Sequence, residues 1–303
     1  MAPRIAWLLN LGAERELEDP RQDALSPELV AALPSFRTRM RSLLRDHDRV
    51  IGIDAALEGC TLALAFCPTP RALARIRAAG QVAAEAPPLA VLARVNGRGF
   101  SAALGQTLSG AAYVRDMDAL LAVVTRPAAD GWLLKRDLSF AGRERRRVQG
   151  GALDASTDGF ARRSFARGQG LQVEPYVART DDFALHGYVL PSGAILLGTP
   201  RRQHCDARGV WQRGEPLASD ALAPCEREAL HTRAMRAGEA LRAAGYFGPF
   251  GIDAFRYLGA DGAPAFQPCS ELNARFSMDY PRDLLERALG VADAPPLGTK
   301  HAD

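Results

Sequence analysis

Short apolar runs alternate with amphipathic segments along the first part of the chain. Residues 5–10, 50–53 and 89–92 are rich in aliphatic side chains, and turn-forming residues lie beside each run. Such runs are typical of buried strands. Apolar residues at helical spacing predict helices over residues 35–45 and 68–76. Because strands and helices alternate, this part of the chain is predicted to be a small α/β unit with a parallel sheet.

The pattern changes after residue 92. Strand-like segments at residues 111–114, 132–135 and 168–177 are separated by polar loops. A hairpin is predicted over residues 183–197, because alternating strands flank Pro191-Ser-Gly193. Residues 224–244 follow the pattern of an amphipathic helix, with proline near the start and glycine just after the end. The later part of the chain is therefore predicted to be α+β.

A second hairpin is predicted near the C-terminus. Its strands cover residues 251–256 and 266–275, and a helix follows over residues 278–289. Glycine and aspartate in Gly259-Ala-Asp-Gly-Ala263 supply the residues that a tight reversal needs. The two strands are therefore expected to pair antiparallel, with the reversal close to Asp261-Gly262.

Polar side chains gather on one face of this hairpin. With that turn, Asp253 lies opposite Ser270 or Glu271. Side chains alternate along a strand, so Glu271, Asn273 and Arg275 share one face while apolar residues take the other. The sequence therefore predicts that two carboxylates, a carboxamide and a guanidinium converge on one patch of sheet.

Oxygen ligands at this density suit magnesium. Mg²⁺ binds through a few carboxylates and completes its coordination with water or phosphate oxygens. The alternative is the polar outer face of an ordinary hairpin, on which Glu271 and Arg275 form a surface pair.

A strand followed by a cationic loop is a candidate phosphate site. Lys135 ends the strand at residues 132–135, and the loop after it contains Ser139, Gly142 and several arginines, among them Arg143. Backbone N–H groups and cations both favour dense negative charge, so this loop can cradle a triphosphate. A basic surface loop that binds nothing is the alternative. Aromatic residues are not interleaved with the arginines, which argues against a nucleic-acid surface.

The stretch from Glu174 to Val177 can accommodate a purine. It offers a carbonyl oxygen for an exocyclic amine, an N–H for a ring nitrogen, and apolar walls from Pro175, Tyr176 and Val177. Strand ends that contain proline are common, so the residues alone are weak evidence for a purine site. The position of this stretch between the lysine strand and the last hairpin is the stronger support.

Composition narrows the class of protein. The chain has 303 residues, of which 47% are apolar and 24% charged, as in ordinary soluble proteins. The net charge of +3 is too small to indicate nucleic acid or a membrane surface. The five cysteines are scattered and never spaced as C-x-x-C, which favours reduced thiols in the cytoplasm over disulfides or a zinc site. The first apolar run is too short for a signal peptide or a membrane span.

Two motifs now identify a resemblance. Gly251-Ile-Asp-Ala-Phe255, followed by Glu271-Leu-Asn-Ala-Arg275, resembles the metal-binding end of the ATP-grasp superfamily, which includes biotin carboxylase and many carboxylate–amine ligases. The resemblance covers about residues 90–290. It implies a pre-ATP-grasp α/β unit over residues 1–92, a first lobe over 93–172 and a second lobe over 173–303.

The resemblance also implies site residues. In the superfamily a strand lysine and the loop after it contact the nucleotide phosphates, a hinge holds adenine, an acid binds the ribose, and the last hairpin binds metal. The matching positions are Lys135, Ser139 and Gly142 for phosphates, Glu174, Tyr176 and Val177 for adenine, Asp182 or Asp181 for ribose, Asp253, Glu271 and Asn273 for metal, and Arg275 for an acyl-phosphate intermediate.

The chain departs from the family pattern in two places. It has no lysine near residues 94–98, where relatives carry a further phosphate-binding lysine, so Arg98 is the first candidate and Arg94 the second. The phosphate loop has one glycine and a run of charges where many relatives have several glycines. Closure of that loop over the nucleotide is therefore expected to differ from closure in those relatives.

By this resemblance the chain is expected to be a cytoplasmic ATP-grasp ligase. It would use ATP with Mg²⁺, or Mn²⁺ in its place, to join a small-molecule carboxylate to an amine, with neither nucleic acid nor membrane as a partner. A homodimer is compatible with this expectation. A non-catalytic ATP-binding regulatory protein and an ATP-dependent phosphotransferase remain alternatives. The sequence does not identify the acid or the nucleophile.

Overall fold

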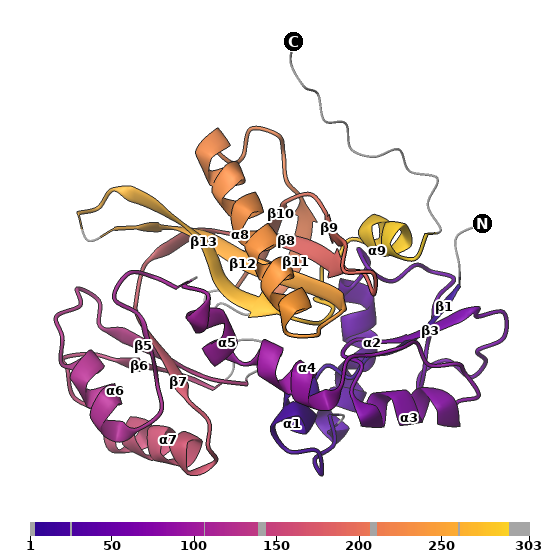
Figure 1. Cartoon of the computed structure of the whole chain (residues 1–303), viewed down its shortest axis with the longest axis horizontal. Helices are drawn as coiled ribbons and strands as arrows, with labels where there is room; N and C mark the ends of the chain where they lie inside the picture. The colour runs from indigo at the N-terminus through magenta and orange to yellow at the C-terminus, as the bar shows by residue number, and fades with distance from the viewer. Residues whose placement is uncertain are drawn as a thin grey trace.

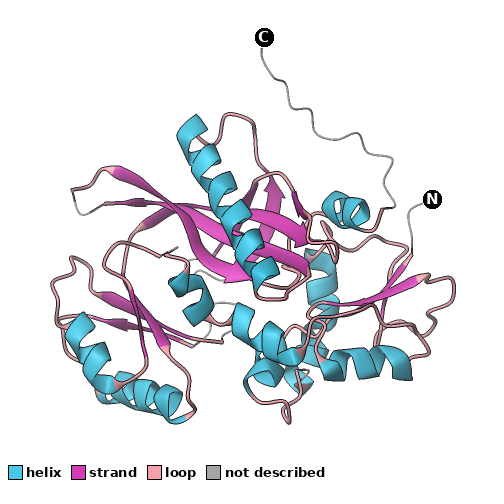
Figure 2. Ribbon diagram, in the orientation of Figure 1, coloured by secondary structure: helices cyan, strands magenta, loops and turns pink. Residues whose placement is uncertain are grey.

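The chain folds around three sheets (Figures 1 and 2). The computed structural model describes residues 4–24, 26–105, 107–138, 144–206, 211–259 and 261–290. None of the helices in these ranges is both long and apolar enough to cross a membrane. A three-stranded sheet comes first in the sequence, a four-stranded sheet second and a six-stranded sheet third.

The N-terminal sheet is parallel, as the sequence predicts. Its central strand β1 (Ile5–Leu8) pairs with β2 (Arg49–Val50) and β3 (Leu62–Ala65). Helices α1 (Ala13–Glu18), α2 (Pro27–Arg39) and α3 (Pro70–Ala78) surround it. Helix α2 begins earlier than the predicted residues 35–45, because Ser26 caps it by accepting a hydrogen bond from the N–H of Leu29.

The prediction of a strand at residues 89–92 is wrong. These residues open helix α4 (Leu89–Asn96), which follows Pro88. Leu92 and Val95 are buried on one side of the helix at a spacing of three residues, and they pack into the core beneath the six-stranded sheet. The third strand of the parallel sheet is β3 instead.

The four-stranded sheet is antiparallel and has the order β4-β7-β5-β6. Its strands are β4 (Ala112–Val114), β5 (Trp132–Arg136), β6 (Arg145–Val148) and β7 (Leu171–Pro175). Helices α6 (Met117–Val124) and α7 (Ala155–Ala166) pack on it, and α4 and α5 (Arg98–Ala103) lie between this sheet and the N-terminal unit (Figure 1).

The six-stranded sheet has one apolar and one polar face. Its main path is β11-β10-β8-β12-β13, and β9 pairs with β8. On the apolar face, residues such as Phe183, Ile252 and Leu272 pack against helix α8. The elements are β8 (Arg179–Val189), β9 (Ile195–Leu197), β10 (Arg201–Cys205), β11 (Trp211–Pro216), α8 (Pro224–Ala243), β12 (Gly248–Leu258) and β13 (Pro264–Asn273).

The register of the last hairpin is as predicted. Asp253 on β12 pairs directly with Glu271 on β13. The next pair, Phe255 with Gln267, leaves one residue on β12 opposite three on β13, so β13 bulges there. The bulge contains Pro268, which has no N–H to give to the ladder. The Ser270 hydroxyl donates to the carbonyl oxygen of Asp253 at 3.1 Å across the bulge.

The segment after β13 joins the six-stranded sheet to the N-terminal unit. Phe276, Tyr280 and Leu284 belong to the same buried cluster as Trp7 and Phe66. The Phe276 ring contacts those of Trp7 and Tyr280 edge-on, at centroid distances of 5.1 and 5.0 Å. This segment ends in α9 (Arg282–Ala288), so one apolar core spans both parts of the molecule.

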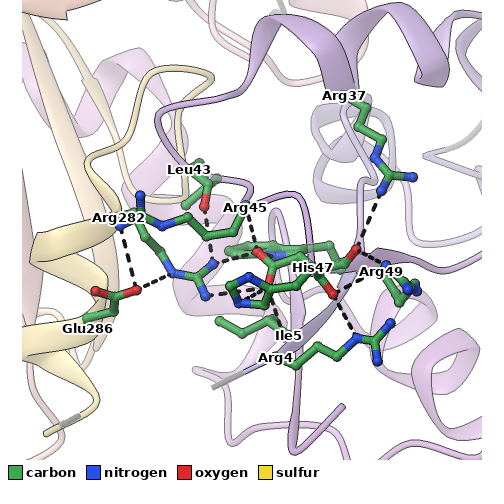
Figure 3. Close-up of polar contacts among 11 residues, drawn as sticks. Arg4, Ile5, Arg37, Leu43, Arg45, His47, Arg49, Arg282 and Glu286 are labelled. Carbon is green, nitrogen blue, oxygen red and sulfur yellow. Dashed lines mark hydrogen bonds and ion pairs between the residues drawn. The ribbon is translucent and has the colours of Figure 1, made fainter. Parts of the chain in front are cut away.

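A buried ion pair fixes the same junction (Figure 3). Arg282 donates to Asp48 Oδ2 at 2.6 Å, to the Leu43 carbonyl oxygen at 3.2 Å and to Glu286 at 2.9 Å. Asp48 also accepts from the Trp7 indole and from the backbone N–H groups of residues 5 and 45. Because so many donors satisfy it, the desolvated carboxylate is tolerated in the interior.

Replacing Asp48→Ala is expected to lower the free energy of unfolding by about 3–5 kcal/mol, because it leaves the Arg282 guanidinium buried without its counter-ion. Urea denaturation would measure the change. Asp158→Ala, which breaks the solvent-exposed pair with Arg162, is the matched control and should change stability little. Equal losses in the two variants would contradict a special role for the buried pair.

Candidate active site

Acidic and amide side chains meet on the polar face of the six-stranded sheet. Asp253 and Glu271 lie side by side on paired strands, and Asn273 follows two residues later on β13. The Asp253 carboxylate accepts from Gln203 Nε2 at 3.1 Å and from Asn273 Nδ2 at 3.4 Å. The predicted convergence of Asp253, Glu271 and Asn273 is therefore present. Gln203 was missed, because its strand β10 was not predicted.

Negative charge is concentrated at this point. Burial, together with the neighbouring charge of Glu271, raises the pKa of Asp253 to about 7. Burial alone would raise the pKa of Glu271 as well, but the charges of Arg98 and Lys135 lower it below its ordinary value. A further cation beside Asp253 would relieve the crowding of the two carboxylates.

Two cations approach these acids from the other lobe. Arg98, the first residue of α5, donates to Glu271 Oε1 at 3.2 Å and to the Arg136 carbonyl oxygen at 2.9 Å. Lys135, on β5, lies near enough to Glu271 that their charges interact. Arg94 instead stacks over the Phe100 ring at 5.8 Å. The geometry thus favours Arg98 over Arg94 as the first cation of the site.

Lys135 is buried and forms an ion pair with Glu174. Burial lowers the pKa of Lys135, while the adjacent carboxylate acts in the opposite direction. Gln172, which pairs with Lys135 across the strands, donates to Glu174 Oε2 at 3.0 Å. Glu174 was expected only to contact adenine. Its side chain also pairs with Lys135. Glu174 lies two residues after Gln172 on β7, so both side chains are on the face of the sheet that carries Lys135.

Tyr176 and Val177 follow the end of β7, an inner strand of the four-stranded sheet. Tyr176 is 37% exposed, and the Arg147 guanidinium stacks on its ring at 3.8 Å from the ring centroid. The Tyr176 N–H donates to the Gly131 carbonyl oxygen at 2.9 Å. Of the N–H groups in the stretch from Glu174 to Val177, that of Tyr176 is therefore engaged within the chain.

The two candidate ribose ligands lie on opposite faces of β8. Asp182 shares the face of Asp253, because it pairs with Gln203 on the next strand, and its charge acts on Asp253. Asp181 lies near Arg202 and Arg256 instead. Asp182, and not Asp181, therefore lies on the face of the sheet that carries Asp253. Arg179 donates to Asp182 at 3.3 Å.

Arg275 lies near enough to Glu271 for their charges to interact, but its direct counter-ion belongs to the N-terminal unit. Strand β13 ends before it, and both Nε and Nη2 contact Glu14 Oε1, at 2.9 and 2.7 Å. Its Nη1 donates to the carbonyl oxygen of Phe276. A desolvated guanidinium needs a counter-ion, and α1 supplies it from the N-terminal unit. The sequence carries no signal for Glu14, which lies 261 residues away.

Ser139, Gly142 and Arg143 lie outside the described residues. The start of their loop is anchored by Asp137, whose carboxylate accepts from the Gly99 N–H at 3.1 Å and the Tyr113 hydroxyl at 2.9 Å. A cavity lies between this anchor and the β12–β13 hairpin. Its lining includes Glu14, Asn96, Arg98, Asp137, Glu271 and Asn273.

The donor set fits Mg²⁺ bound together with a phosphorylated ligand. Asp253, Glu271 and Asn273 offer only oxygen among the atoms that can bind a metal. No three His, Cys, Asp or Glu side chains in the described ranges are grouped closely enough to hold a metal by themselves. A cation here would complete its coordination with oxygens from outside the chain, as Mg²⁺ does with nucleotide phosphates.

Comparison with known proteins places the fold. No protein-family model and no curated protein sequence matches the chain. Solved structures do match it. Biotin carboxylase from Campylobacter jejuni superposes with a TM-score of 0.55 at 13% identity, over 93% of this chain and 67% of that one. D-alanyl-alanine synthetase A from Vibrio cholerae gives 0.53 at 12% identity, over 96% and 94%.

Two further matches show how length varies among such structures. The D-cycloserine synthetase DcsG gives a TM-score of 0.51 at 15% identity, over 95% of this chain and 100% of that one. Pyruvate carboxylase from Rhizobium etli gives 0.54 at 15% identity, but the chain spans only 27% of its length. At these identities the likeness is one of fold. The chain has a parallel α/β unit followed by two antiparallel sheets, and it matches these structures over most of its length. It therefore has the ATP-grasp fold.

Proposed function

We propose that the protein is an ATP- and Mg²⁺-dependent ligase. It would activate a small-molecule carboxylate as an acyl phosphate, join the acyl group to an amine and release ADP and phosphate. One observation carries the proposal: Lys135 and Arg98 from one lobe approach Asp253 and Glu271 from the other. Solved neighbours bear the names of synthetases and carboxylases, and one such synthase was solved with ATP, which supports this class.

In this proposal the cations bind the polyphosphate. Lys135 is held in place by the carboxylate of Glu174, so its ammonium group is positioned before the nucleotide arrives. Arg98 now pairs with Glu271, and a phosphate oxygen could take over the guanidinium. Glu271 would then be available to hold Mg²⁺ together with Asp253 and Asn273. The bound Mg²⁺ would neutralise negative charge on the transferred phosphoryl group.

Binding and orientation account for most of the catalysis in such a site. The acid substrate would lie in the cavity beside Arg98 and Asn273, where its oxygen can attack the terminal phosphorus. Arg275, paired with Glu14 of the N-terminal unit, would orient the substrate. It would not bind the substrate as an unpaired cation.

We also propose that the chain is divided into three units, at residues 1–92, 93–172 and 173–303.

ADP release in the presence of acid and amine panels separates the proposal from its alternatives. A ligase requires both substrates for ADP release. A phosphotransferase needs no second nucleophile, and an ATP-binding regulatory protein gives no turnover. Release that depends on one added substrate alone, or no release at all, would contradict the ligase.

Replacing Glu271→Gln is expected to lower turnover by at least about a hundredfold, because it removes one preorganised charge from the centre of the site. The Glu271 side chain is 31% exposed, so folding should change little. ADP release and thermal unfolding would be measured on the same sample. Near-normal turnover would place the metal elsewhere.

Replacing Lys135→Met separates nucleotide binding from folding. The single variant should lose about 3–5 kcal/mol of stability, because Glu174 stays buried without its partner. The double variant Lys135→Met/Glu174→Leu should recover much of that loss. Both should bind an ATP analogue far more weakly in calorimetry. Wild-type affinity in the double variant would show that Lys135 does not contact the nucleotide.

A further inference from the structure

Asp137 places a third carboxylate at the cavity of the candidate site, besides those of Glu14 and Glu271. It follows β5, two residues after Lys135. In the proposed function Lys135 binds polyphosphate, and a negative charge near bound phosphate is unfavourable. The contacts that Asp137 makes within the chain explain why a carboxylate lies there.

Each oxygen of the Asp137 carboxylate has a donor. Oδ1 accepts from the Gly99 N–H at 3.1 Å, and Oδ2 accepts from the Tyr113 hydroxyl at 2.9 Å. Burial, together with the charge of Asp137, raises the pKa of Tyr113 to about 12, so its hydroxyl keeps the proton at neutral pH. The tyrosine is therefore a constant donor, and the two contacts hold the carboxylate in one orientation.

Tyr113 is itself fixed on both sides. Its hydroxyl also accepts from the Gly170 N–H at 3.2 Å. A Cβ atom at Gly99 would lie 2.8 Å from Cζ of the Tyr113 ring, and one at Gly170 would lie 2.2 Å from the same atom. Neither glycine has a positive φ, so both positions need glycine for the space that the ring occupies. The ring therefore lies between the first turn of α5 and the residue that precedes β7.

The segment that Asp137 holds carries Arg98. The Arg98 N–H donates to the Asp137 carbonyl oxygen at 3.4 Å, and Arg98 Nε donates to the Arg136 carbonyl oxygen at 2.9 Å. The Gly99 N–H, next in the chain, donates to the Asp137 side chain. Arg98 is only 8% exposed, and from this anchored position its guanidinium reaches Glu271 Oε1 at 3.2 Å. The direction of the Arg98 side chain therefore depends on Asp137.

We propose that Tyr113 is a positioning residue that acts through Asp137 to hold Arg98 where it binds the nucleotide phosphates, an inference that rests on the proposed function. Tyr113 contacts neither nucleotide nor metal in this arrangement. Without its hydroxyl, Asp137 Oδ2 lacks a donor and the carboxylate can turn away from the Gly99 N–H. The Arg98 guanidinium must then be ordered when phosphate binds, and that ordering lowers affinity.

A double-mutant cycle tests whether Tyr113 acts through Arg98. The dissociation constant of a non-hydrolysable ATP analogue with Mg²⁺ would be measured by calorimetry for the wild type, Tyr113→Phe, Arg98→Met and the double variant. Thermal unfolding would be recorded for each. Tyr113→Phe is expected to weaken binding about tenfold, the scale of a hydrogen bond to a charged group. In the Arg98→Met background the same change should have little further effect, because residues that act as one unit are not additive.

Asp137→Asn gives the sign of the effect. Asparagine keeps one oxygen for the Gly99 N–H, but its amide nitrogen cannot accept from Tyr113, so positioning predicts weaker binding. A carboxylate that acted only on the phosphates would give stronger binding once its charge is removed. Tyr246→Phe is the matched control, because the buried Tyr246 hydroxyl donates to the Pro249 carbonyl oxygen in the core beside α8. It should lower the unfolding temperature and leave the affinity unchanged.

The outcomes separate this inference from the proposed function. Wild-type affinity in Tyr113→Phe, or the same loss with and without Arg98, would overturn the positioning role and leave Arg98 as a phosphate ligand. Stronger binding by Asp137→Asn, or equal weakening by Tyr246→Phe, would overturn it as well. If Arg98→Met binds as tightly as the wild type, or the wild type binds no ATP analogue, the proposed phosphate site itself fails and the inference fails with it.

Discussion

The end of β13 is the point on which the rest of the structure depends, because separate parts of the chain fix it there. The Asn96 side chain donates to the Ala274 carbonyl oxygen at 3.2 Å and accepts from its N–H at 3.0 Å. The Phe276 N–H donates to the Phe66 carbonyl oxygen, and Glu14 holds Arg275. Backbone groups that leave a sheet must find new partners, and here α4 and the N-terminal unit supply them. The position of the acidic hairpin is thus set by residues far from it in sequence.

Charge balance explains how these acids remain close together. Opposed carboxylates on neighbouring strands are unfavourable, and burial together with the charge of Glu271 raises the pKa of Asp253. Arg98 reduces this repulsion by contacting Glu271 from the other lobe. The lobes are therefore linked through the same charges that would bind a metal nucleotide. In the proposed function, a phosphate would replace Glu271 as the partner of Arg98.

Much of this arrangement could be predicted where the information is local. Strand alternation predicts that Asp253 and Glu271 lie on one face of the hairpin. Their direct pairing depends on the bulge in β13, because the register of Leu258 with Pro264, continued without it, would place Asp253 opposite Cys269. The helix at residues 89–96 could not be predicted, because a short apolar run fits both strand and helix, and only its packing decides. The Glu14–Arg275 pair likewise comes from tertiary structure alone. The roles of the individual site residues and the boundaries of the three units stay predictions.

The central claim is that Lys135 and Arg98 share a polyphosphate with Asp253 and Glu271. A crystal structure of the protein with Mg²⁺ and a non-hydrolysable ATP analogue tests it most directly. The account predicts phosphate oxygens in contact with Lys135 and Arg98, and a metal ion on Asp253 and Glu271 with the Arg98–Glu271 pair opened. A nucleotide bound elsewhere, or phosphates that leave Lys135 paired only with Glu174, would contradict it.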